Sequence, residues 1–108
     1  MERFIKYSSK EKLEQLRKYS DPEAVLSKAK SLGYDPNTIY LSPKQGKKYM
    51  IITPNGKQVN FGAIGYQDFT SHKDLARRDN YLKRSGGIRG NWENDKYSPN
   101  NLSRNLLW

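Results

Sequence analysis

The sequence has no cysteine and only one histidine, His72. Without cysteine the chain can form neither a disulfide nor a zinc site with thiolate ligands. A single histidine gives none of the spacings that are typical of imidazole metal sites. No hydrophobic run approaches the roughly 20 residues that a membrane-spanning helix needs. We therefore expect no metal, no cofactor and no membrane span.

Apolar residues are scarce as well, at 34% of 108 residues, which is low for a globular protein. Tyrosine supplies much of the material for a core, with eight copies against three phenylalanines. A tyrosine can bury its ring, but its hydroxyl needs a polar partner. The chain is therefore expected to form one small domain with a thin, amphipathic core.

Positive charge is abundant: 20 lysines and arginines stand against 11 acidic residues, a formal net charge of +9. Such an excess favours an acidic neighbour, which can be nucleic acid, an acidic protein surface or an anionic lipid. The other interpretation is that the charge only keeps the protein soluble.

Residues 1–33 predict a pair of helices. Ser8 and Glu11 have the spacing of a capping box, so a first helix is expected over 9–19. Asp21 and Pro22 are typical of a second helix start, where the aspartate caps and the proline takes the first helical position. Gly33 is a natural left-handed stop.

A β-hairpin is predicted over 48–53 and 57–61, around the turn Pro54-Asn55-Gly56. This turn places Ile51 opposite Val59 and Tyr49 opposite Phe61, on one face of the hairpin. With a short strand over 38–41 it makes a three-stranded antiparallel sheet, which a helix can cover.

A basic helix is predicted over 71–84, after a loop with two glycines, and residues 34–84 thus hold the sheet and this helix. At about 100° per residue, one helix face presents a cationic set. This set consists of Lys73, Arg77, Asn80 and Arg84. Leu75 and Leu82 lie on the opposite side, where they are expected to dock the helix. The predicted fold class is α+β.

Residues 85–108 are rich in glycine, asparagine and serine, which predicts a flexible, extended C-terminal arm. Within it, Ser98-Pro99 can start a short helix. The aromatic residues of the arm, Trp92, Tyr97 and Trp108, can stack on bases. Leucine and tryptophan near its end favour docking instead, either back onto the core or into a neighbouring subunit. The residues expected to dock are Trp92, Leu106, Leu107 and Trp108.

The candidate binding residues form three groups. The first is the cationic helix face, whose side chains can donate to phosphates. The second is at the foot of the hairpin and consists of Lys44, Lys47 and Lys48. The third is Arg89, in a segment rich in glycine. The alternatives are that the helix arginines pair with nearby aspartates and brace the fold, and that the hairpin lysines only discourage edge pairing.

A catalytic role would have to use His72, with Asp68 or Asp74 as an orienting carboxylate. No serine or cysteine nucleophile signal stands beside it. Gly62 and Gly65 have the spacing of a backbone-clamping GxxG loop, but they follow a strand, so a turn is the better interpretation. A non-enzymatic protein is expected, with a small nuclease-like enzyme as an alternative.

The second half of the chain also matches a longer pattern. It has Phe-Gly after a strand, Gly-Tyr-x-Asp-Phe-Thr-x-His-x-Asp, two basic residues, Tyr-Leu, a loop aromatic and Ser-Arg-x-Leu-Leu-Trp. The matching residues are Phe61, Gly62, Gly65, Tyr66, Asp68, Phe69, Thr70, His72, Asp74, Arg77, Arg78, Tyr81, Leu82, Trp92, Ser103, Arg104, Leu106, Leu107 and Trp108. This run resembles a family of small uncharacterised proteins of large double-stranded-DNA viruses of eukaryotes. Arg84-Ser85 stands where that pattern has Arg-His, and the stretch before Ser103 is more polar.

The resemblance implies a viral origin and no particular activity. It leads to the hypothesis of a non-enzymatic virion component, either minor capsid or genome-associated, located in the virion or the host cytoplasm. Its acidic partner would be viral DNA, RNA or an acidic viral protein, with neighbouring capsid subunits as further contacts. The alternative is a nucleic-acid-binding factor of the infected cell.

Overall fold

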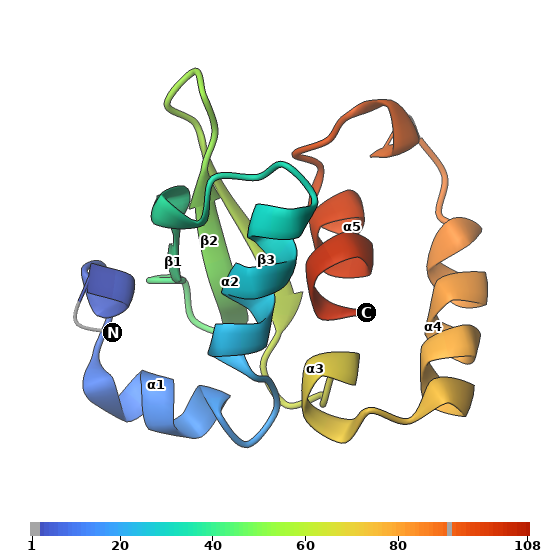
Figure 1. Ribbon diagram of the computed structural model, residues 1–108, viewed down its shortest axis with the longest axis horizontal. Helices are drawn as coiled ribbons and strands as arrows, with labels where there is room; N and C mark the ends of the chain where they lie inside the picture. Colours follow the sequence, from blue (N-terminus) through green and yellow to red (C-terminus); the bar gives the residue numbers. More distant parts are fainter. Residues whose placement is uncertain (1–2, 91) are drawn as a thin grey trace.

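The computed structural model describes residues 3–90 and 92–108. It is an α+β domain with one small antiparallel sheet, which confirms the predicted fold class (Figure 1). The strands are β1 (Ile39–Leu41), β2 (Lys47–Ile52) and β3 (Gln58–Ala63). The helices are α1 (Lys10–Leu16), α2 (Pro22–Ser31), α3 (Phe69–His72), α4 (Leu75–Gly86) and α5 (Pro99–Leu102). Short helical turns occupy η1 (Arg3–Ile5), η2 (Pro36–Thr38), η3 (Trp92–Asn94) and η4 (Ser103–Leu107), of which the last is π-helical. Within these described ranges, no helix is long and apolar enough to cross a bilayer.

The hairpin has the predicted register. Tyr49 pairs with Phe61 and Ile51 with Val59, and β1 adds to the outer side of β2. The turn closes through a hydrogen bond from the Gly56 amide to the Thr53 carbonyl, 2.8 Å long, and Gly56 has φ 84°. The two strands are shifted by one or two residues from the predicted bounds.

The N-terminal helix pair is also present. The Asp21 side chain accepts from the Ala24 amide at 3.3 Å and starts α2, and Gly33 follows it with φ 87°. The predicted capping box was wrong, because Ser9 rather than Ser8 caps α1 by accepting from the Lys12 amide. The first helix is correspondingly shorter than 9–19.

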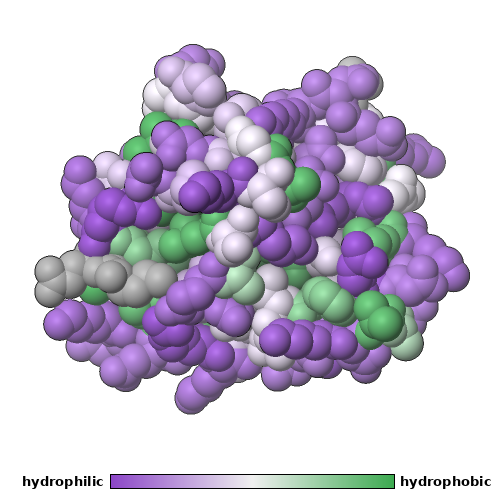
Figure 2. Space-filling model, in the orientation of Figure 1, coloured by the Kyte–Doolittle hydropathy of each residue, from purple (hydrophilic) through white to green (hydrophobic). Residues whose placement is uncertain are grey.

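The core lies between one face of the sheet and a layer made by α2 and the α5–η4 segment, which lie side by side in Figure 1. The face of the molecule in Figure 2 is mostly hydrophilic, with smaller hydrophobic areas. Leu102, Leu106 and Leu107 are fully buried in the core. The expectation of a flexible, extended arm over 85–108 was therefore wrong. Ser98 caps α5 by accepting from the Asn101 amide, as its sequence suggested, and the leucines that follow supply apolar surface that the rest of this thin core lacks.

The predicted basic helix is broken in two. Asp68 caps α3 and Asp74 caps α4, each by accepting from backbone amides. Between the two helices Lys73 takes the left-handed conformation, with φ 55°. Because each aspartate starts its own helix, Lys73 lies outside α4 and does not share a helix face with Arg77.

Helix α4 stands beside the domain and is held mainly by polar and aromatic contacts (Figure 1). The Tyr81 and Trp108 rings stack with centroids 4.3 Å apart. Arg104 donates to the Leu82 carbonyl at 2.7 Å, and Arg78 donates to the Trp108 backbone oxygen at 2.7 Å. Leu75 is 70% exposed, so the predicted apolar docking seam was wrong at that position.

Candidate binding site

A pocket of about 670 Å³ opens between the end of β3, helix α4 and the α5–η4 segment, and we call it the α4 pocket. Its apolar lining combines aromatic and aliphatic side chains from all three elements and from the loop after β3. They are Phe61, Tyr66, Tyr81, Ile88, Leu107 and Trp108. Phe61 and Leu107 are almost completely buried, whereas the Tyr66 residue is 73% exposed. The pocket thus has an apolar interior and an exposed tyrosine beside it.

The polar lining is cationic and amide-rich. It consists of Lys47, Gln67, Arg77, Asn80, Arg84, Asn100 and Ser103, together with the buried Lys48. Arg77, Asn80 and Arg84 recur at intervals of three and four residues along α4, which puts them on the helix face that borders the pocket. Three positions of the predicted cationic face are therefore brought together here, with Lys47 from the hairpin.

The arginines of this pocket have no carboxylate partner among residues 3–90 and 92–108. The ion pairs among the described residues join Arg17 to Glu23, Lys48 to Asp68 and Lys83 to Asp79. Arg77 donates to the neutral Gln67 Oε1 at 3.3 Å, and the Arg84 guanidinium lies 5.6 Å from the centroid of the Tyr81 ring. Their positive charge is thus not neutralised by an acidic side chain within the described ranges.

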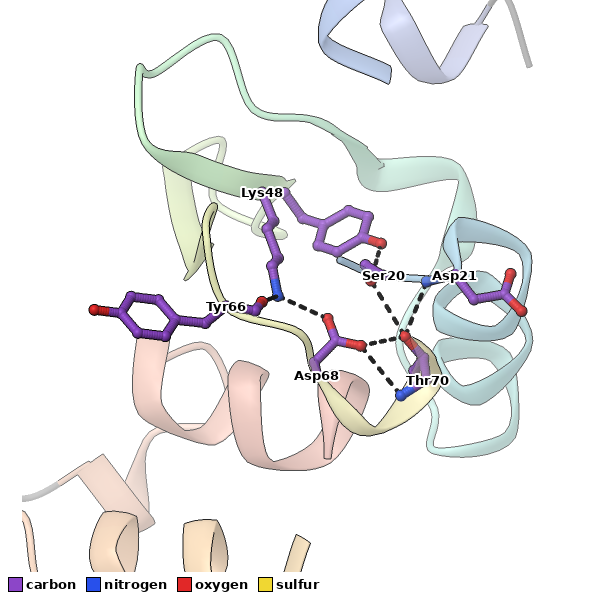
Figure 3. Close-up of polar contacts among 7 residues, drawn as sticks. Ser20, Asp21, Lys48, Tyr66, Asp68 and Thr70 are labelled. Atoms are coloured by element: carbon purple, nitrogen blue, oxygen red, sulfur yellow. Dashed lines mark hydrogen bonds and ion pairs between the residues drawn. The ribbon is translucent and has the colours of Figure 1, made fainter. Parts of the chain in front are cut away.

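Lys48 is a different case, and its prediction as a surface binding residue was wrong. Its side chain is 3% exposed, and its Nζ donates to Asp68 Oδ2 at 3.0 Å and to the Tyr66 carbonyl at 2.6 Å (Figure 3). Burial lowers the pKa of Lys48, while the charge of Asp68 acts in the opposite direction. Lys48 therefore holds the loop after β3 in place instead of facing a partner.

The ion pair belongs to a buried polar network (Figure 3). Asp68 also accepts from the amide and the hydroxyl of Thr70, and the Thr70 hydroxyl accepts from the Asp21 amide at 3.0 Å. Ser20 lies within hydrogen-bond distance of Thr70 and of the Tyr49 hydroxyl, at 3.2 and 2.5 Å. The network joins the loop after β3 to the corner between α1 and α2. This network was not predicted from the sequence, although Asp68 and Thr70 stand two residues apart, a spacing that suits a local cap.

Other predicted residues lie outside the pocket. Lys44 and Arg89 are exposed and do not line it. Lys73 borders a second, smaller hollow of about 330 Å³ near the N-terminus of α2. Trp92 is half-buried, and its indole donates to the Ile88 carbonyl at 2.8 Å.

Of the two docking alternatives, Leu106 and Leu107 take the first, since they pack on this chain's own core and not on a partner. Leu106 and Leu107 are 0% and 1% exposed, because both fill the core beneath the sheet face. Neither can insert into a partner without unfolding η4. Trp108 is half-buried against Tyr81 and remains at the edge of the pocket.

The histidine does not meet the carboxylate that a catalytic pair would need. His72 Nδ1 accepts from the Asp74 amide at 2.9 Å, and Asp68 is engaged by Lys48 and Thr70. His72 Nε2 is buried and has no hydrogen-bond partner among the described residues. Burial, followed by the nearby charge of Arg77, lowers the pKa of His72. The part of the chain that the structure describes has no group of three or more residues that could hold a metal ion.

Residues 37–85 match a family of unknown function (DUF5754). The match covers less than half of the chain, from the start of the sheet to the last turn of α4. It includes the hairpin, the buried ion pair and the arginines of α4, and excludes the α5–η4 wall of the pocket. No curated protein and no solved structure matches the chain. The sheet and the basic helix are thus similar to a family of unknown function.

Proposed function

We propose that this chain is a non-enzymatic nucleic-acid-binding protein that contacts phosphates through the α4 side of the molecule. The observation that supports this most is the pair Arg77 and Arg84, which border one pocket and have no carboxylate partner within the described residues. Lys47 joins them from the hairpin. A net charge of +9 adds a favourable long-range field for a polyanion.

The non-enzymatic part of the proposal is supported by the histidine environment. The buried Asp68 serves the Lys48 ion pair, and His72 Nδ1 serves as an acceptor for a backbone amide. Neither group is arranged to exchange a proton with a substrate. A nuclease-like reaction would have to use other residues.

The viral setting is a proposal that depends on the resemblance described above. Under it, the protein is a genome-associated component of the virion or acts in the host cytoplasm. The packed C-terminal segment removes one argument for a capsid role, because its leucines lie in this chain's own core, the alternative to docking into a neighbouring subunit. Association with the genome therefore agrees better with the fold than a docking arm does.

The test measures the binding of a short fluorescein-labelled oligonucleotide by fluorescence anisotropy, at about 50 and 200 mM salt. The charge-removing variant is Arg77→Ala with Arg84→Ala. Because each lost phosphate contact reduces the salt slope by about 1, we expect the double variant to lower the slope by about 2 and to weaken binding at low salt.

The matched control is Lys30→Ala with Lys57→Ala, which also removes two positive charges, from exposed positions on α2 and the hairpin turn. Its salt slope should stay close to that of the unaltered protein. Equal losses in the two double variants would show only a general charge effect and would contradict the proposed site. An absence of binding at low salt would overturn the function itself.

A further inference from the structure

We propose that the α4 pocket receives one unpaired nucleobase, so that the protein prefers single-stranded to double-stranded nucleic acid. This inference depends on the proposed function and names its ligand more closely. The pocket, at about 670 Å³, has the size of a small-molecule site, which is unusual for a surface that only contacts a phosphate backbone.

The rim of the pocket is cationic and its interior is apolar. A nucleotide has the matching pair of groups, a charged phosphate and a flat base. Arg77 and Arg84 can bind the phosphate. The interior offers exposed or half-buried aromatic and aliphatic side chains, including Tyr66, Ile88 and Trp108, against which a flat base can stack. A peptide that offers only carboxylates would satisfy the arginines but would leave this aromatic interior unused.

Amide side chains supply the hydrogen-bonding groups that a base edge needs. Asn80 lines the pocket, and its carboxamide makes no hydrogen bond to any other described residue. Asn100 donates to the Ser85 carbonyl at 3.1 Å, which leaves its side-chain oxygen as an acceptor. Carboxamides pair with the edges of bases through one donor and one acceptor. In a duplex the faces of each base are stacked and its Watson–Crick edge is paired, so a base must be unpaired to enter the pocket.

The walls of the pocket are held in place by contacts within the chain. On one side the Tyr81 and Trp108 rings are nearly parallel, 12° apart. On the same side Arg104 donates to the Leu82 carbonyl and, at 2.6 Å, to the Ser85 hydroxyl. On the other side the Lys48 amine fixes the Tyr66 carbonyl, and Figure 3 shows the Tyr66 ring pointing away from the buried network. A site formed in advance loses less entropy when it binds.

The decisive variant is Asn80→Trp, which fills the pocket from an exposed position of α4 without changing the net charge. Its matched control is Ser27→Trp, at an exposed position of α2 that does not line the pocket. Each variant is titrated with a labelled single strand, the same strand with one abasic nucleotide, and the corresponding duplex. We expect the unaltered protein and Ser27→Trp to prefer the single strand by about tenfold, and Asn80→Trp to lose that preference.

A second readout follows the indole N–H signals of the two tryptophans by NMR, with adenosine monophosphate and ribose 5-phosphate as probes. Trp108 borders the pocket and Trp92 does not, so the nucleotide should shift the Trp108 signal alone, and the sugar phosphate should shift it much less. A Trp92→Phe variant assigns the two signals.

The outcomes separate the inference from the proposed function. If single strand, abasic strand and duplex bind equally, and only the arginine variant weakens them, phosphate binding stands and the base pocket is refuted. If Asn80→Trp keeps the full single-strand preference, the base pocket is likewise refuted. If an acidic peptide shifts the Trp108 signal and the nucleotide does not, the ligand is a protein and the inference is wrong.

Discussion

The buried ion pair between Lys48 and Asp68 gives the sharpest test of what holds this domain together. The two side chains are 3% and 0% exposed, and their charged atoms lie 3.0 Å apart. The substitution Lys48→Met keeps most of the apolar stem and removes the charge. It leaves Asp68 buried with only the two donors of Thr70, and it takes a donor from the Tyr66 carbonyl.

The size of the effect follows from that uncompensated charge. Removing one partner of a buried ion pair costs about 3–5 kcal/mol, because the other charge stays out of water. A domain of this size has a free energy of unfolding of about 5–15 kcal/mol in total. The midpoint of thermal unfolding should therefore fall by about 15–30 °C.

The measurement is urea unfolding followed by circular dichroism, with Lys57→Met as the control. Lys57 is exposed in the hairpin turn, so the same change there should alter the free energy of unfolding by less than about 0.5 kcal/mol. Combining Lys48→Met with Asp68→Asn removes both charges, and the double variant should lose at least about 1 kcal/mol less than the sum of the two single variants. If Lys48→Met costs less than about 1 kcal/mol, the pair is not desolvated as described and the reasoning is refuted.

Three further predictions concern the core, the loop after β3 and the histidine. Leu102→Ala should cost about 2–5 kcal/mol in urea unfolding, because Leu102 is fully buried. Gly62→Ala should cost about 1–3 kcal/mol more than Gly65→Ala: both glycines have positive φ, but only at Gly62 would a Cβ come within 2.9 Å of Leu107 Cδ1. Because the folded state lowers the pKa of His72, stability should be unaffected well above pH 6.5 and should fall as the pH drops through that value, and His72→Phe should weaken this dependence in urea titrations.

Each of these predictions has a plain contradiction. If Leu102→Ala left the free energy of unfolding unchanged, Leu102 would not be packed in the core, and the expectation of a flexible arm would stand. Equal costs at Gly62 and Gly65 would mean that backbone strain alone matters and that the contact with Leu107 does not. A stability that rises toward low pH would show that His72 gains a partner when protonated, contrary to its buried Nε2.

The hairpin could be predicted closely because its determinants are local. The turn Pro54-Asn55-Gly56 fixes the register, and the register fixes which side chains share a face. The burial of Lys48, one residue from Tyr49, could not be predicted in this way. Its burial depends on Asp68, which lies 20 residues further along the chain, and no local pattern marks that pairing.

The C-terminal segment shows why composition misled. Its asparagines and serines indicated flexibility, but several of their side chains bond to backbone groups. Asn101 donates to the carbonyls of Trp92 and Asp95, at 2.7 and 2.9 Å, and Ser98 caps α5. These bonds hold the turn before α5, and this turn places Leu102 in the core. The mean composition of a segment gives no weight to such contacts.

The predicted cationic face was found in part for a related reason. Helical spacing correctly placed Arg77, Asn80 and Arg84 together, since all three lie within α4. It failed for Lys73 because the Asp74 cap starts a new helix after it. When helix faces are assigned from sequence, an aspartate that can cap should be treated as a helix boundary, as a proline is.

The buried ion pair also bears on why the pocket has its shape. The attraction between the two charges need not add stability, since a buried ion pair often contributes no more than well-packed hydrophobic groups. An apolar residue, however, could not donate to the Tyr66 carbonyl as Lys48 does. That bond sets the path of the loop, and the next residue, Gln67, accepts from Arg77 across the pocket. We therefore expect a variant with Lys48→Met and Asp68→Asn, in which the asparagine oxygen can still cap α3, to recover part of the stability lost by Lys48→Met in urea unfolding. In the anisotropy assay it should not recover tight nucleic-acid binding, because the loop that positions Arg77 would have lost its anchor; full recovery of binding would contradict this role of Lys48.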